Sequence, residues 1–95
     1  MGYLLISDLR LPPDIMLVSL VLIKAETGKE RDVESEVRKI FGVREAHLLF
    51  GVYDISVKVE CKNLEELTDI VINKIRRIPG VKETKTLPGV RYGSI

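Results

Sequence analysis

The sequence has few of the side chains that build reactive centres. It contains one cysteine, one histidine and no tryptophan in 95 residues. The single cysteine, Cys61, cannot form an internal disulfide bond, which fits a reducing compartment. One cysteine and one histidine are too few for a structural zinc site, and the chain has no glycine-rich phosphate loop and no His-Glu-x-x-His motif. The sequence therefore predicts no metal ion, no other cofactor and no catalytic residue.

An excess of one charge and a long hydrophobic run are also missing. The 15 basic and 14 acidic residues leave a net charge of +1, whereas nucleic-acid binding usually requires a clustered basic excess. The mainly apolar run at residues 15–23 is far too short to span a bilayer, and no signal-peptide cleavage pattern follows it. We expect a cytoplasmic protein without a membrane contact, in which this run is a buried central strand.

What the sequence does contain is a near-repeat. Residues 39–46 (Lys-Ile-Phe-Gly-Val-Arg-Glu-Ala) reappear in outline as residues 77–84 (Arg-Ile-Pro-Gly-Val-Lys-Glu-Thr). Each copy ends a helix-like segment, breaks at glycine and begins a strand-like segment at valine. Two such units in one short chain predict a split β-α-β fold.

Hydrophobic periodicity and capping signals complete this outline. Strands are predicted at 16–25, 43–50, 53–60 and 81–87. A first helix is predicted from a capping box, in which the Thr27 hydroxyl accepts from the Glu30 amide, to about Ile40. A second helix is predicted to begin after the cap Asn63 and to stop at Gly80. The order β-α-β-β-α-β predicts an α+β, ferredoxin-like sandwich, with a four-stranded antiparallel sheet and both helices on one face.

The first predicted strand is apolar on both of its faces. Met16, Val18, Leu20 and Leu22 alternate with Leu17, Val21 and Ile23. Helices on one side of the sheet can cover only one of these sets, so the other set needs a second cover. The simplest cover is another copy of the chain, which predicts a sheet-to-sheet dimer, a dimeric α/β barrel. His47 is interpreted as a strand residue at this subunit contact rather than as a catalytic base.

The segment Gly51-Val52-Tyr53-Asp54 joins the second and third predicted strands and has no counterpart in the repeat. One interpretation is hairpin chemistry, in which glycine supplies a positive φ and Asp54 bonds the nearby backbone. The other interpretation is a ligand site. Glycine lets a ligand approach the backbone, an exposed amide can bind a carboxylate, and Asp54 can hold an ammonium group. An α-amino acid carries both of these charges.

Three motifs together resemble the RAM domain, the effector-binding half of the Lrp/AsnC transcription regulators. They are Gly42-Val43-x-Glu45-Ala46, Gly51-x-Tyr53-Asp54 and Ile78-Pro79-Gly80-Val81-x-x-Thr84-x-Thr86. Their order, spacing and element type all agree with that family. The resemblance covers residues 16–87, which leaves residues 1–15 as an N-terminal extension and residues 88–95 as a C-terminal tail.

The resemblance implies sheet-to-sheet dimers, up to an octamer of four dimers, and an amino acid effector bound in a cleft between subunits. Carried over to this sequence, the ligand-binding residues are Gly51, Val52, Tyr53, Asp54, Thr84 and Thr86. Asp54 would hold the α-amino group or a polar ligand side chain, and the backbone of residues 51–53 would meet the carboxylate. Thr84 and Thr86 would supply hydroxyl groups.

The family's regulators also carry a helix-turn-helix, which residues 1–15 cannot form. The resemblance therefore implies a stand-alone domain without direct DNA binding, which senses an amino acid or co-assembles with full-length Lrp/AsnC regulators. Residues 1–15 are expected to pack on the domain or on a neighbouring subunit. Two alternatives stay open: a small enzyme on a dimeric ferredoxin-like scaffold, with His47 or Tyr53 in a buried cavity, and an assembly domain without a ligand.

Overall fold

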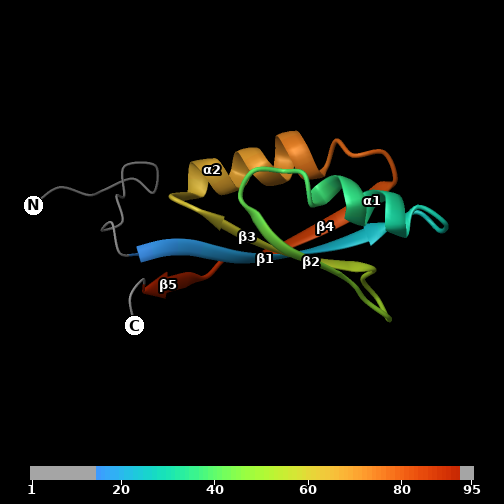
Figure 1. Cartoon of the computed structure of the whole chain (residues 1–95), viewed down its shortest axis with the longest axis horizontal. Helices are drawn as coiled ribbons and strands as arrows, with labels where there is room; N and C mark the ends of the chain where they lie inside the picture. The colour runs from blue at the N-terminus through green and yellow to red at the C-terminus, as the bar shows by residue number, and fades with distance from the viewer. Residues whose placement is uncertain (1–14, 93–95) are drawn as a thin grey trace, which may run out of the picture.

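The computed structural model describes residues 15–92, in which an antiparallel sheet carries its helices on one face (Figure 1). The elements are β1 (Ile15–Ala25), α1 (Glu30–Val37), β2 (Val43–Leu48), β3 (Ile55–Cys61), α2 (Leu64–Asp69) with its π-helical continuation η2 (Ile70–Ile75), β4 (Val81–Leu87) and β5 (Val90–Tyr92). The strand order is β2-β3-β1-β4, and β5 also pairs with β1. This arrangement confirms the predicted α+β, ferredoxin-like fold.

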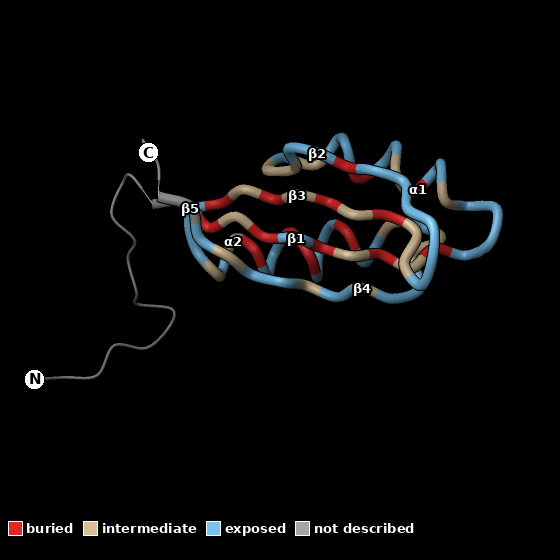
Figure 2. The backbone as a smooth tube through the Cα atoms, turned by 90° about the horizontal axis from the view of Figure 1, so that it is seen from below, coloured by how far each residue is buried: buried red, intermediate tan, exposed pale blue. Residues whose placement is uncertain are grey.

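The hydrophobic core lies between the helices and the side of the sheet that faces them. Buried residues alternate along β1 and β3 with residues that are half-buried or, at Leu20, exposed (Figure 2), as the period-two pattern predicts. The fully buried side chains that close this core are Val21, Ile23, Val33, Val37, Ile55, Val57, Val59 and Ile75. Burial of each such side chain stabilises the fold by about 1.5–3 kcal/mol, so this layer holds the helices against the sheet.

The predicted N-terminal cap is correct for α2 and wrong for α1. Asn63 caps α2 as predicted, because its side-chain oxygen accepts from the Glu66 amide at 2.8 Å. The predicted Thr27 cap is wrong: the N-cap of α1 is Lys29, and no side chain caps it. Gly28, at φ 91°, turns the chain between Thr27 and the helix. Only the Glu30 carboxylate reaches back, accepting from the Gly28 amide at 2.9 Å.

The helix α1 is also shorter than predicted. It ends at Val37 rather than near Ile40, because the following bonds tighten to a three-residue spacing. Ile40 N donates to Val37 O at 3.1 Å, and Val43 N donates to Ile40 O at the same distance. This tight turn brings the chain directly into β2.

The C-terminal part of the chain differs from the predicted tail. The backbone of Val90–Tyr92 forms β5, which pairs with Ile15–Leu17 of β1. The strand β1 is longer than β4, so its first residues need another partner for their backbone groups. Pro88 and Gly89 separate β4 from β5, and Gly89 O accepts from Val18 N at 2.7 Å. The predicted N-terminal extension, up to residue 14, and residues 93–95 lie outside the described residues.

The face of the sheet opposite the helices is open within residues 15–92. On β1 its side chains are Met16, Val18, Leu20, Leu22 and Lys24, none of which is buried. Leu20 is 40% exposed, and its cross-strand neighbour Leu87 is 44% exposed. This confirms that the central strand is apolar on both faces. No helix among residues 15–92 is long and apolar enough to cross a membrane.

Gly80 packs closely against the start of α1, and its substitution can measure how tight this packing is. It has φ +100°, and an added Cβ would lie 2.9 Å from Lys29 Cβ and 3.1 Å from Val33 Cγ2. Gly51 also has a positive φ, of +118°, but an added Cβ there would meet nothing within 4 Å. Both alanine variants carry the left-handed backbone penalty of about 1–2 kcal/mol. We expect Gly80→Ala to lose about 1–3 kcal/mol more because of overpacking, measured as the free energy of unfolding in urea. Equal losses would contradict the close packing of this loop.

Candidate functional site

Asp54 holds the loop between β2 and β3, residues 49–54. Its amide donates to Ile23 O at 2.9 Å, and its carbonyl oxygen accepts from Leu49 N at 2.7 Å. Its carboxylate Oδ2 accepts from Ala25 N at 2.8 Å, next to the point where the pairing of β1 with β4 shifts register. Asp54 thus bonds the nearby backbone, as the hairpin interpretation predicts.

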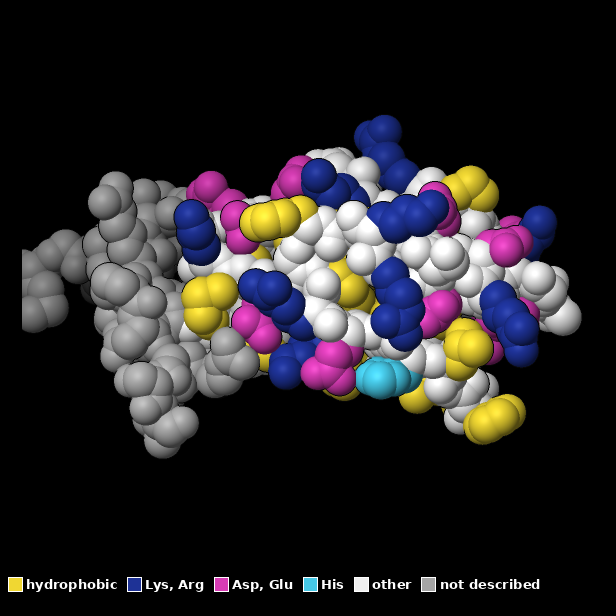
Figure 3. Space-filling model, viewed as in Figure 1, with side chains coloured by type: hydrophobic (Ala, Val, Ile, Leu, Met, Phe, Trp, Pro, Cys, Tyr) yellow, Lys and Arg dark blue, Asp and Glu magenta, His cyan; other side chains and the backbone are white. Residues whose placement is uncertain are grey.

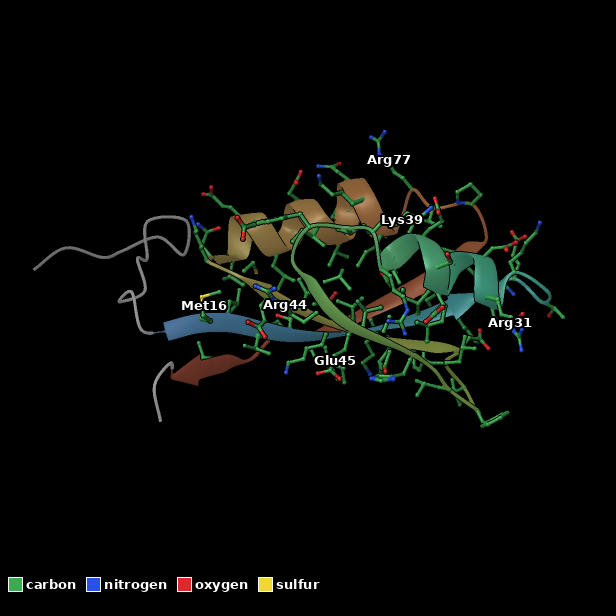
Figure 4. The ribbon with its side chains drawn as sticks, viewed as in Figure 1. Met16, Arg31, Lys39, Arg44, Glu45 and Arg77 are labelled. Atoms are coloured by element: carbon green, nitrogen blue, oxygen red, sulfur yellow. The ribbon has the colours of Figure 1, made fainter. Side chains whose placement is uncertain are left out.

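A cavity of about 470 Å³ lies between this loop and the start of α1. Its lining residues are Glu30, Arg31, Leu48, Leu49, Phe50, Gly51 and Asp54. The cavity combines carboxylates, a guanidinium group and an apolar wall, and its volume is in the range of small-molecule sites. Arg31 lies at the start of α1, at the end of the molecule from which the hairpin projects (Figure 4).

Two of the residues predicted for the loop take part in this cavity and two do not. Gly51 and Asp54 line it. Val52 is 72% exposed at the tip of the hairpin. The Tyr53 hydroxyl lies 3.5 Å from Glu83 Oε2, so this side chain reaches across β1 towards β4.

The predicted threonines lie elsewhere on the sheet. Thr84 and Thr86 are half-buried on β4 and pair with Ile23 and Val21, whose side chains face the helices. Because β1 separates β4 from β3, the threonines are about 10 Å, two strand spacings, from the strand that follows the loop. Within one chain, the structure therefore does not bring them into the cavity with Gly51 and Asp54.

The cavity also contains residues that the sequence analysis missed. Glu30 and Arg31 were assigned to a helix start, and Leu48, Leu49 and Phe50 to a strand. The sequence signal that could have identified the last three is that they form an unbroken apolar run before Gly51. Consecutive apolar residues that stay exposed are unfavourable unless they have a function. Phe50 is fully exposed, at 107% of the reference area. Hydrophobic side chains are visible at the lower right, where the hairpin projects (Figure 3).

His47 lies on the open face of the sheet, with its side chain 63% exposed. Its Nε2 is 3.1 Å from Glu45 Oε1, and Lys58 Nζ is 3.5 Å from Glu45 Oε2. The His47 hydrogen bond, followed by the charge of Lys58, lowers the pKa of Glu45 below its usual value. The enzyme alternative requires His47 or Tyr53 in a buried cavity, but His47 is exposed and Tyr53 is only half-buried. Among residues 15–92, no group of His, Cys, Asp and Glu could hold a metal ion.

Comparison with known proteins gives a consistent match. Residues 18–90 match the family model of the Lrp/AsnC ligand binding domain. The HTH-type transcriptional regulator FL11 of Pyrococcus abyssi is 37% identical over 71 residues, which cover 75% of this chain and 46% of the relative. An uncharacterized HTH-type transcriptional regulator of Pyrococcus horikoshii is 43% identical over 58 residues, covering 61% of this chain and 39% of the relative. The chain thus spans less than half the length of these regulators.

Solved structures agree with the sequence comparison. FFRP-DM1 superposes with a TM-score of 0.73 at 33% identity, covering 77% of this chain and 97% of that chain. AsnC of Escherichia coli superposes with a TM-score of 0.72 at 26% identity, covering 77% of this chain and 50% of that chain. The fold described above is therefore found both in a chain of similar extent and in part of a longer regulator.

The bond between Asp54 and Ala25 predicts a difference between two substitutions. Asp54→Ala leaves the amide of the buried residue Ala25 without its acceptor, which costs about 1–3 kcal/mol. Asp54→Asn keeps an oxygen in the same place, so we expect it to lose less than half as much. Urea denaturation of both variants checks this. If the two lose the same stability, the carboxylate contact does not hold the loop.

Proposed function

Because this chain belongs to the Lrp/AsnC ligand-binding domain family, we propose that it is an oligomeric regulatory module that binds an amino acid. The regulatory role follows from the family and from the transcriptional regulators among its relatives. The family is one of regulatory ligand-binding domains, so the chain is not an enzyme. The single observation that supports amino-acid binding is the cavity beside Gly51 and Asp54, which offers charges of both signs next to an apolar wall.

In this proposal the ligand uses the part of the loop that the fold leaves open. The ammonium group meets Oδ1 of Asp54, because Oδ2 is bonded to Ala25 N. The backbone of residues 51–53 would meet the carboxylate, and at Gly51 the space in which a Cβ would project is empty. Thr84 and Thr86 would have to come from a neighbouring copy, because within one chain they lie on β4.

The open face of the sheet supports association with a second copy. Leu20 and Leu87 are neighbours on this face and remain exposed. The hairpin projects on the same side of the sheet, away from the helices (Figure 1), and carries Phe50 and Val52 at its tip. We propose that a second chain packs sheet to sheet on this surface, and that the dimers associate further, up to four.

Longer regulators of the same family are the proposed partners. The chain matches only 39–46% of the length of the curated relatives, and that part contains the fold and the surface through which copies would associate. A copy could therefore take the place of the corresponding domain in a mixed assembly. That this chain does not itself bind DNA stays a prediction.

Amino-acid binding can be tested by denaturation with each of the twenty amino acids. A ligand present at one hundred times its dissociation constant should stabilise the protein by about 2.7 kcal/mol. We expect at least one amino acid to do so, and we expect Asp54→Asn to lose most of this gain while it stays folded. If no amino acid stabilises the wild type, amino-acid sensing is wrong and the assembly domain without a ligand becomes the better hypothesis.

The sheet-to-sheet contact can be tested by sedimentation. Leu20→Glu places a charge in the centre of the open face, so we expect this variant to sediment as a monomer at concentrations at which the wild type is a dimer. Ile72→Glu is the matched control, because Ile72 is 43% exposed but lies in η2, on the helical side. A wild type that is monomeric at micromolar concentration would contradict the proposed dimer.

A further inference from the structure

Arg31 occupies a position that the stability of its helix does not explain. It lies in the first turn of α1, where the helix dipole favours negative charge and opposes a cation. The other two basic residues at this helix pair with acidic neighbours, Arg38 with Glu34 and Lys39 with Glu36. Arg31 forms no ion pair with any residue of the 15–92 range. An exposed arginine in this place is available to bind something outside the fold.

Arg31 lines the cavity together with Asp54 and with apolar residues of the hairpin. Arg31 belongs to the lining from α1, whereas Asp54 belongs to it from the loop that follows β2. Leu48, Leu49 and Phe50 form the apolar part of the same lining. The cavity thus presents one cation, the two carboxylates of Glu30 and Asp54, and an apolar surface within one volume of about 470 Å³.

We infer that Arg31 binds the carboxylate of an amino acid and that Leu48, Leu49 and Phe50 select a large apolar side chain. This inference rests on the proposed function, and it adds a residue of α1 and a class of ligand. The planar guanidinium group matches a carboxylate with two parallel hydrogen bonds. With Asp54 on the ammonium group, both charges of the ligand are then held by side chains.

The apolar wall gives the selectivity. A charged or strongly polar ligand side chain placed against the leucines and Phe50 would lose water without gaining a partner, which is costly. An apolar side chain gains instead from the area that it buries there. Leucine, isoleucine, methionine and phenylalanine fit this description, whereas aspartate, lysine and glycine do not.

Calorimetric titration with leucine and with leucinamide separates the role of Arg31 from amino-acid binding in general. Leucinamide keeps the ammonium group and the side chain but has no carboxylate. We expect the wild type to bind leucine at least tenfold more tightly than leucinamide, alanine or lysine. In Arg31→Gln, the affinity for leucine should fall about 10- to 100-fold, the ratio expected for a charge-assisted hydrogen bond. The affinity of this variant for leucinamide should not change.

Two further variants complete the experiment. Arg77→Gln changes an exposed arginine after the C-terminal end of η2, which Figure 4 shows well away from Arg31, and it should bind leucine as the wild type does. Leu49→Ala should reduce the preference for leucine over alanine. Urea denaturation should show that Arg31→Gln is as stable as the wild type, because Arg31 has no partner to lose among the described residues.

The outcomes distinguish this inference from the proposed function. If the wild type binds leucine and leucinamide equally, or if Arg31→Gln binds leucine as tightly as the wild type, the role of Arg31 is wrong, although amino-acid binding stands. If a charged or small amino acid binds most tightly, the selectivity of the apolar wall is wrong. If no amino acid binds the wild type, both the inference and the proposed function fail.

Discussion

The position of β1 in the middle of the sheet is the constraint on which the rest of the structure depends. Val21 and Ile23 pair with Val57 and Ile55 of β3 and point into the core below the helices. Because side chains alternate along a strand, the intervening residues must point to the opposite face, where no helix of residues 15–92 lies. A slip of one residue would exchange the two sets. The same register that builds the core therefore creates the exposed apolar surface.

The end of β1 also fixes the candidate site. Ile23 O and Ala25 N both bind Asp54, so the strand positions the loop that forms one side of the cavity. Ala25 N bonds a side chain at the point where the pairing of β1 with β4 changes register between Lys24 and Ala25. A ligand on the Asp54 carboxylate would thus contact a group that already joins the loop to the central strand. Core, open face and cavity all depend on one strand.

The sequence was sufficient for features that depend on neighbouring residues and insufficient for those that depend on distant ones. Both ends of β4 and the Asn63 cap were predicted correctly, because alternation and capping are local. The sequence did not indicate which face Thr84 occupies, because Val81 and Thr84 both pair with helix-facing residues of β1 across an irregularity in register. A local irregularity of this kind changes which face a residue occupies, and no residue type marks it here. Arg31 was missed because its proximity to Asp54 arises only when α1 packs over the sheet.

The hairpin residues connect the proposed ligand binding with the proposed assembly. Leu48, Leu49 and Phe50 line the cavity, yet the hairpin that carries them also projects on the side where a second copy is proposed to pack. If a neighbouring copy completes the cavity with its Thr84 and Thr86, the ligand binds the assembled form more tightly and must strengthen association by the same factor. If the neighbour covers the apolar wall instead, ligand and neighbour compete, and the ligand must weaken association by the factor that it loses in affinity. If the proposed binding at this cavity and the proposed association at this hairpin both occur, the sign of their coupling depends on which of these two groups the neighbour contacts.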